Sequence, residues 1–203
     1  IYNSNGNMLT AQIKSAGGIP SYLGIARDNE EDLMEKFKWA LQCDMVVSSG
    51  GVSVGDYDLV KTSLQKMGQE MLFWKVAMKP GKPLAFGRID DIPIFGLPGN
   101  PVSSFVSFEQ FVRPSIRKMM GANRLTHRAV QAKLTRTIHK KAGRQHFLSA
   151  HVQWENGECT VNPTQEQGSG ILKSTINANG LLIFPLELTE MAEGTEATVQ
   201  LLE

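Results

Sequence analysis

The sequence predicts an α/β domain, with a mostly parallel sheet and helices on both faces, followed by a small all-β domain. Over residues 1–122, short apolar runs alternate with segments of helical periodicity, which is typical of right-handed βαβ units. Over residues 123–203, only short strand-like runs remain, separated by turn residues. About 80 residues of this kind predict a barrel or a compact sandwich. We therefore expect two domains, 1–122 and 123–203.

Helices of the first domain are predicted from apolar periodicity and from capping residues. The first should end at the Gly17-Gly18 pair, and the second should begin after Asp28-Asn29, both of which are candidate caps. The last begins at Pro101 and should kink at Pro114. The predicted helices span residues 8–16, 30–42, 57–68 and 101–121.

Strand-like runs connect these helices and make up the second domain, where a turn is expected at 155–157. In the first domain, Gly-rich segments follow several of the runs. Because ligands of α/β sheets bind beyond the carboxyl ends of the strands, these segments are candidate binding loops. The runs span residues 19–26, 44–51, 70–78, 82–87, 92–99, 129–138, 146–154, 159–163, 180–186 and 196–202.

The charge distribution is uneven although the formal net charge is only +1. Residues 110–154 contain ten Lys and Arg and no Asp or Glu, whereas residues 155–203 contain eight Glu and one Lys. The basic stretch is a candidate nucleic-acid patch, but it has few aromatic residues for stacking, so we expect no nucleic-acid partner. No apolar run reaches the roughly 18 residues of a membrane span, and we expect no membrane partner.

The two cysteines, Cys43 and Cys159, are far apart and form no metal-binding spacing, which favours reduced thiols in a cytoplasmic protein. The four histidines also lack a zinc-binding pattern. The first residues resemble a strand end that runs into a helix cap, so we expect the chain to be part of a longer protein.

The segment 48–58, SSGGVSVGDYD, lies between a predicted strand and a predicted helix. Glycines allow close approach of the backbone to a ligand, and amides at a helix N-terminus bind anions. No Lys follows, so an ordinary P-loop is disfavoured, and a tight turn without a ligand remains the alternative. The candidate phosphate-binding residues are Ser49, Gly50, Gly51, Ser53, Gly55 and Asp56.

Two carboxylates, Asp28 and Asp58, follow neighbouring predicted strands and are candidate ligands of Mg²⁺, which prefers few carboxylates together with phosphate and water oxygens. Each alone is more typical of a helix cap, and it is the pair beside the glycine loop that makes a metal site an equal alternative. The segment Lys79-Pro80-Gly81-Lys82-Pro83 holds two ammonium groups on a stiff turn and suits an oxyanion, although a solvated proline turn remains an alternative.

Another loop, 97–104, ends a strand and opens a helix, and it offers Pro98, Gly99 and Asn100 as candidate binding residues. In the second domain, the segments 140–144 and 167–170 stand out, although each alone is typical of a hairpin turn.

Three long motifs, VVSSGGVSVGDYD, VAMKPGKPLAFG and FGLPGNPVSSF, occur in this order, and together they resemble the MoeA/gephyrin family of molybdopterin molybdenumtransferases. The segments IYNSNGNML, GRQHFLSA and EQGSGILKS extend the resemblance over essentially the whole chain. The resemblance implies a MogA-like α/β domain whose start is missing and a C-terminal β-barrel domain, with two further domains upstream.

The family's activity, as the resemblance implies it, is the Mg²⁺-dependent insertion of molybdate into adenylylated molybdopterin with release of AMP. The resemblance also implies a cytoplasmic homodimer with an active site between subunits. Its partners would be a MogA-type adenylyltransferase and molybdoenzyme-maturation proteins. The isolated fragment is expected to be inactive if the missing domains supply necessary residues.

Site residues follow from matching these motifs. Asp28 and Asp58 match the family's functional carboxylates, and the GGVSVG loop would hold the pterin phosphate. Many relatives carry Asp at the position of Asn3, and Asn3 is therefore left out of the metal site. Lys79 and Lys82 would also act in catalysis. The residues that would bind molybdate are Lys79, Lys82, Pro83, Ser103, Arg144 and Ser169.

Two alternatives to this enzyme remain open. Relatives of the gephyrin type also act as scaffolds that bind receptor peptides, so the chain could be a non-catalytic interaction module. A generic nucleotide-binding regulator would instead bind ATP tightly without selecting a pterin.

Overall fold

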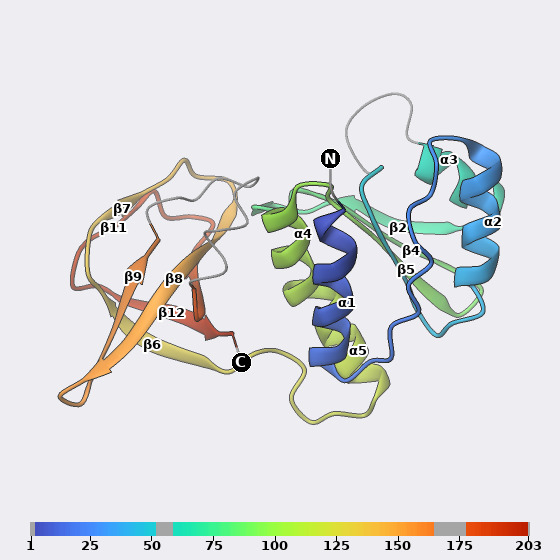
Figure 1. Cartoon of the computed structure of the whole chain (residues 1–203). Helices are drawn as coiled ribbons and strands as arrows, with labels where there is room; N and C mark the ends of the chain where they lie inside the picture. The colour runs from blue at the N-terminus through green and yellow to red at the C-terminus, as the bar shows by residue number, and fades with distance from the viewer. Residues whose placement is uncertain (1–2, 52–58, 165–177, 203) are drawn as a thin grey trace. The chain divides into compact units, whose positions relative to one another are not determined.

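The computed structural model describes residues 3–51, 59–164 and 178–202. The chain divides into two compact units (Figure 1). The α/β unit comprises Ile1–Val76 and Gly81–Leu125, and the barrel unit comprises Ala77–Pro80 and Thr126–Glu203. The short segment Ala77–Pro80 thus belongs to the barrel unit, although it lies within the predicted first domain.

The α/β unit contains a four-stranded sheet of order β1-β5-β4-β2. Among the described strands, β1 and β5 pair in parallel, and the other two pairings are antiparallel. The α/β class is confirmed, but the described sheet is mixed rather than mostly parallel. The reason is the short connection at Asp90-Asp91, which leaves no room for a crossover helix. The strands are β1 (Val46–Ser49), β2 (Glu70–Lys75), β4 (Pro83–Ile89) and β5 (Ile92–Leu97).

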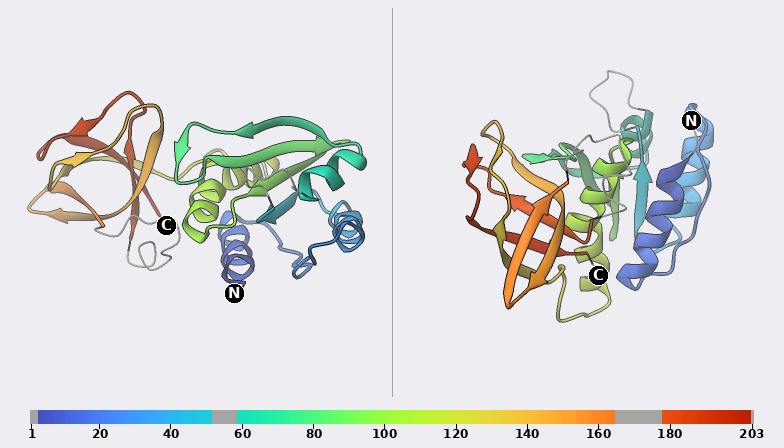
Figure 2. Two further views of the ribbon diagram at one scale, coloured as in Figure 1. Left: turned by 90° about the horizontal axis from the view of Figure 1, so that it is seen from above. Right: turned by 60° about the vertical axis from the view of Figure 1, so that its left-hand side comes forward.

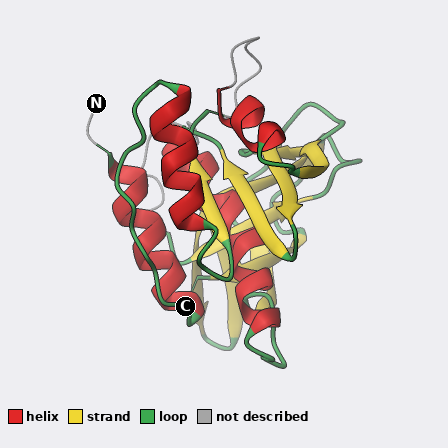
Figure 3. Cartoon of the chain, turned by 90° about the vertical axis from the view of Figure 1, so that its right-hand side faces the viewer, coloured by secondary structure: helices red, strands yellow, loops and turns green. Residues whose placement is uncertain are grey.

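Helices cover both faces of this sheet (Figure 3). Phe95 and Leu97 of β5 pack in a core with α1, α5 and the π-helical turn that precedes α5, whereas Ile94 of the same strand packs in a second core with α2 and α3. This alternation follows from the two-residue period of a strand. The helices are α1 (Ser4–Ala16), α2 (Glu30–Ala40), α3 (Leu59–Lys66), α4 (Pro101–Ser107) and α5 (Arg113–Met119), with a π-helical turn, η1 (Phe108–Val112), between the last two.

Local capping explains where these helices begin and end. The Asn3 carboxamide accepts a hydrogen bond from the amide of Gly6 at 3.0 Å, and Gly17 ends α1 in the left-handed conformation. Asn29 caps α2 through the amide of Asp32 at 2.9 Å, so the cap of the predicted pair is Asn29 and not Asp28. The predicted disturbance at Pro114 appears as the π-helical turn just before it, since proline lacks the amide that a regular helix needs.

The predicted strand over residues 19–26 is wrong. The structure leaves this segment without regular secondary structure and outside the sheet, and Ile19 and Ile25 are 98% and 68% exposed. Its apolar pattern suits a strand, but a strand also needs a hydrogen-bonded neighbour. Within the described residues, β1 pairs only with β5, and no strand joins this segment to the sheet.

The barrel unit is a closed five-stranded ring of order β10-β12-β6-β9-β8, because β10 pairs with both β12 and β8 (Figure 2). This settles the predicted barrel or sandwich as a barrel. A short strand, β3 (Met78–Lys79), pairs in parallel with β8, and β7 pairs with β11. The remaining strands are β6 (Ala129–Leu134), β7 (Ile138–His139), β8 (Gln145–Glu155), β9 (Glu158–Pro163), β10 (Gly180–Phe184), β11 (Glu190–Met191) and β12 (Glu196–Leu201).

The β8–β9 hairpin shows how local chemistry sets a register in the barrel. Asn156 and Gly157 both have positive φ and connect Glu155 to Glu158, which is the geometry of a type I′ turn. The predicted turn is confirmed.

No helix among the described residues is long and apolar enough to cross a membrane, and Cys43 and Cys159 are both free thiols.

Candidate functional site

The loops that follow β1 and β5 lie side by side at one edge of the α/β sheet. The parallel register places Ser49 opposite Leu97, so both strands end at the same level. The Gly50 amide donates to the Leu97 carbonyl at 3.0 Å, and the Ser49 hydroxyl donates to the Pro98 carbonyl at 3.3 Å. Two of the predicted binding loops are therefore in direct contact.

The backbone conformation favours glycine in the loop after β1. Gly50 and Gly51 have φ values of 87° and 71°, a region that other residues adopt only with strain. At Gly99 of the neighbouring loop, a Cβ atom would lie 3.7 Å from the Gly50 Cα, an ordinary van der Waals contact, so the two loops are close without clashing. Because glycine has no side chain, the backbone of the exposed Gly51 and Gly99 is accessible to a polar ligand at this edge.

A third element, the first turn of α1, joins the same edge through Asn5. Its side-chain amide donates to the Ser49 hydroxyl and to the Gly99 carbonyl, both at 2.8 Å. Asn5 is only 9% exposed, and its Oδ1 atom has no hydrogen-bond partner among the residues that the structure describes. An unpaired buried acceptor costs about 1–3 kcal/mol, so its presence here marks a position where stability is not the only constraint.

Sequence reasoning missed Asn5. The available signal was its position on the buried face of α1, which it shares with Leu9, Gln12 and Ala16. A buried side-chain amide needs hydrogen-bond partners. The partners of Asn5 are more than forty positions away in the sequence, so the sequence does not reveal them.

The other predicted phosphate-site residues are only partly described. Asn100 occupies the N-cap position of α4, and its carbonyl accepts from the Ser104 amide at 2.9 Å. Pro98 is buried against this edge. The residues Ser53, Gly55, Asp56 and Asp58 lie outside the described residues, so their predicted roles stay predictions.

Of the two predicted metal ligands, Asp28 and Asp58, the structure describes only Asp28. Asp28 is exposed, directly before the cap of α2, and it takes part in no ion pair with a described residue. Among the described residues, no group of three or more His, Cys, Asp or Glu is arranged to hold a metal ion. The exposed Asp28 carboxylate is therefore accessible, and carboxylate oxygens are ligands that Mg²⁺ prefers.

The predicted oxyanion residues fall in both units. In the α/β unit, the Lys82 side chain is exposed, and its carbonyl accepts a hydrogen bond from the Val76 amide at 3.1 Å. Pro83 is the first residue of β4, and Ser103 is buried in α4. Ser169 lies outside the described residues. Lys79 and Arg144 belong to the barrel unit.

The barrel unit brings Lys79 and Arg144 to one place, around His146. Lys79 of β3 pairs with His146 of β8, and Arg144 lies just before β8. Burial of the imidazole, and then the charges of Lys79, Lys140 and Arg144, lower the pKa of His146 to about 4. Lys140 and His146 had no role in the sequence prediction, although Lys140 lies in one of the segments that it singled out.

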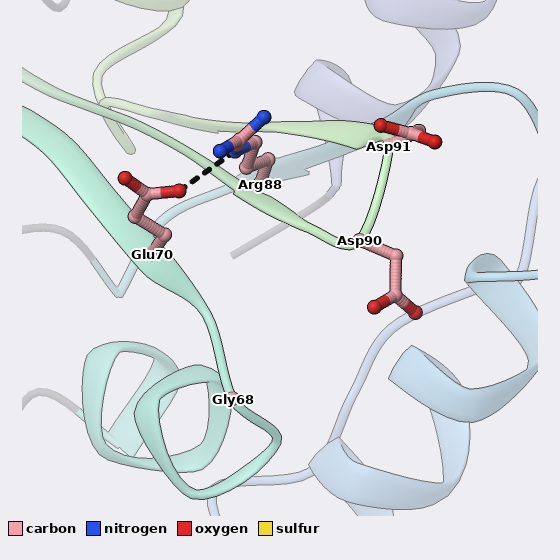
Figure 4. A pocket seen from close by; sticks show the side chains of 5 residues that line it. All are labelled: Gly68, Glu70, Arg88, Asp90 and Asp91. Atoms are coloured by element: carbon pink, nitrogen blue, oxygen red, sulfur yellow. Dashed lines mark hydrogen bonds and ion pairs between the residues drawn. The ribbon is translucent and has the colours of Figure 1, made fainter.

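A surface pocket elsewhere in the α/β unit is lined by Gly68, Glu70, Arg88, Asp90 and Asp91 (Figure 4). It lies at the turn before β5, at the opposite end of that strand from the glycine loops. Arg88 donates to Glu70 at 2.7 Å, and both side chains are more than half exposed, so the pair contributes little to stability. We assign no role to this pocket.

Two family comparisons agree with this architecture, an α/β unit with glycine loops at one sheet edge followed by a closed barrel. Residues 1–118 match the family of the probable molybdopterin binding domain. Residues 131–202 match the MoeA C-terminal region, domain IV. The chain belongs to the MoeA/gephyrin family.

Individual relatives agree. Proteins named molybdopterin molybdenumtransferase are 37% identical in Haemophilus influenzae, over 88% of this chain and 45% of that protein, and 35% identical in Bacillus subtilis, over 91% and 43%. The crystal structure of the molybdopterin biosynthesis MoeA protein of Pyrococcus horikoshii superposes with a TM-score of 0.84 at 30% identity, over 100% of this chain and 49% of that one. The chain thus spans about half the length of the relatives that it matches.

Proposed function

We propose that the protein containing this chain inserts molybdate into adenylylated molybdopterin, with release of AMP, as a Mg²⁺-dependent step of molybdenum cofactor biosynthesis. The observation that carries the proposal is the convergence of Asn5, Ser49 and Gly99 at a bare sheet edge. The names of the relatives support the reaction class.

In this proposal the glycine loops hold the pterin and its phosphate. Asn5 fixes the Ser49 hydroxyl and the Gly99 carbonyl in place, and the bare backbone at Gly50 and Gly51 admits the ligand closely. Loops that are held in place in this way need no rearrangement when the ligand binds. Asp28 and Asp58 would hold Mg²⁺, which supplies charge neutralisation at the phosphate.

Molybdate, a tetrahedral dianion and a substrate here, is expected to bind basic side chains. Lys79 and Arg144 lie around one imidazole in the barrel unit, which supports their predicted role. Lys82, Pro83, Ser103 and Ser169 remain predicted molybdate residues on the strength of the resemblance. The homodimer, the MogA-type partner and the cytoplasmic location are likewise proposals.

The test is molybdate-dependent cofactor formation from adenylylated molybdopterin by the full-length protein. Asp58→Ala and Lys82→Ala should each lower the rate at least tenfold, whereas the exposed control Asp44→Asn should leave it unchanged. Unchanged rates in the first two variants would contradict the assignment.

The alternative function is a non-catalytic scaffold of the gephyrin type. The exposed apolar side chains of segment 19–25 are the observation that favours it, because large exposed apolar residues in a row suit a protein contact. A full-length protein that binds adenylylated molybdopterin but never releases AMP would support the scaffold.

A further inference from the structure

Three basic side chains in the barrel unit lie close enough to a single buried imidazole to influence its charge. His146 is 9% exposed, on β8, and Lys79 lies next to it because β3 and β8 pair in parallel. Arg144 immediately precedes β8, and Lys140 follows β7. Within the described residues, none of the three cations forms an ion pair with a carboxylate.

Lys140 is held in place by the fold, unlike an ordinary surface lysine. Its backbone amide donates to the Thr189 carbonyl at 2.8 Å, and its ammonium donates to the Leu186 carbonyl at 3.1 Å. The ammonium also lies 4.9 Å from the centre of the Phe184 ring. These contacts fix the charge at low entropic cost, which is what an anion-binding lysine needs.

The Phe184 ring links Lys140 to the imidazole. Phe184 pairs with His146 across β10 and β8, and their ring centres lie 6.4 Å apart with the edge of one toward the face of the other. Lys140 and His146 thus share one packing partner that is 1% exposed. The cluster is built on paired strands and a buried ring rather than on a free loop.

Grouping three cations that have no carboxylate partner among the described residues is unfavourable for the protein alone. Like charges repel, and burial followed by the charges of the cluster lowers the pKa of His146, which keeps the imidazole neutral. A bound dianion would offset this repulsion, and charge-assisted hydrogen bonds to its oxygens would add to the gain. The neutral imidazole can then contribute one N–H donor and one acceptor nitrogen.

We propose that Lys140 and His146 complete, with Lys79 and Arg144, a binding site for a tetrahedral oxyanion in the barrel unit. The inference rests on the proposed function in taking molybdate as the anion. It goes further in giving Lys140 the third charge and His146 the position of a neutral hydrogen-bonding group beneath the anion. The phosphate of AMP presents similar chemistry, so the test includes both.

The experiment is a calorimetric titration of the full-length protein with molybdate and, separately, with AMP. Lys140→Ala is compared with Lys141→Ala, which removes the same charge from the neighbouring exposed position. We expect Lys140→Ala to raise the Kd of molybdate about tenfold and Lys141→Ala to raise it less than twofold. Equal effects of the two variants would overturn the proposal, and so would a response to AMP with none to molybdate.

A second measurement needs no variant and therefore does not depend on folding of the mutants. In an NMR spectrum of the imidazole nitrogens, molybdate should shift the His146 signals and leave those of the exposed His151, also on β8, unchanged. Unmoved His146 signals at saturating molybdate would overturn the proposal.

Failure of this inference is distinguishable from failure of the proposed function. Molybdate-dependent cofactor formation that is unaffected by Lys140→Ala would contradict the site while the enzyme stands. Molybdate binding that depends on Lys140, without any cofactor formation, would support the oxyanion site and contradict the proposed enzymatic function.

Discussion

The two units treat the edges of their sheets in opposite ways. In the barrel unit, five strands close on themselves, and the additional strand β3 attaches Lys79 to β8. In the α/β unit, the described sheet is open at β1 and β2, and segment 19–26, which forms no strand, leaves apolar side chains in solvent. Closure protects backbone groups, whereas an open sheet relies on a neighbour for the same purpose.

This difference also separates how each unit builds its polar site. The open sheet gathers loops at the ends of parallel strands, where bare glycines face outward. The barrel instead places charged side chains near the His146 imidazole, which packs against Phe184 of the barrel core. One site is therefore made of backbone, and the other is made of side chains.

The largest expected effect tests the core of the barrel. Phe184 is 1% exposed and contacts both His146 and Lys140, so Phe184→Ala should cost about 3–5 kcal/mol of stability in the barrel unit. Hydrogen exchange of β8 and β10 amides would measure the loss. The half-exposed Leu188→Ala is the control and should cost less than about 1 kcal/mol. Similar effects of the two variants would show that the ring does not support the barrel.

The next effect concerns pH. The pKa of His146 is lowered to about 4 in the folded state, below its ordinary value of 6.5, so the unfolded state binds more protons between these values. Stability should therefore fall as the pH drops from about 6.5 to 4, by up to about 3 kcal/mol from this group. Denaturation of wild type and His146→Gln at several pH values isolates the contribution. Parallel pH profiles of the two proteins would contradict it.

An intermediate effect concerns the sheet edge. Asn5→Ala removes two hydrogen bonds and also one unpaired acceptor, and it should cost about 1 kcal/mol while weakening pterin binding more strongly. Asn7→Ala, at an exposed position of the same helix, is the matched control. Urea denaturation and a binding titration measure the two effects. A loss of stability without a loss of binding would make Asn5 purely structural.

The smallest effect is expected in the exposed segment. Ile19→Lys should change the free energy of unfolding by less than about 0.5 kcal/mol, because this side chain is 98% exposed and loses nothing on substitution. Thermal unfolding of the 203-residue chain measures it. A loss above about 1 kcal/mol would show that the segment packs against a partner in solution, and the contrast between an open and a closed unit would then disappear.

Prediction from the sequence succeeded where the determining forces are local. The end of α1 at Gly17, the disturbance before Pro114 and the turn at Asn156-Gly157 each follow from the conformational preference of one or two residues. The strand over residues 19–26 failed because its pattern specifies a suitable strand and not the presence of a pairing neighbour. The parallel share of the sheet was overestimated because the two-residue turn at Asp90-Asp91 forces β4 and β5 to be antiparallel.

By itself, the sequence determined the α/β-then-β order, the positions of the glycine loops and the family resemblance carried by its three long motifs. Only the tertiary structure decided which side chains meet: Asn5 with Ser49 and Gly99, and Lys79, Lys140 and Arg144 around His146. The physical reason is the range of the interactions. Turns, caps and periodicity depend on neighbours along the chain, whereas a strand register brings together residues that are tens of positions apart.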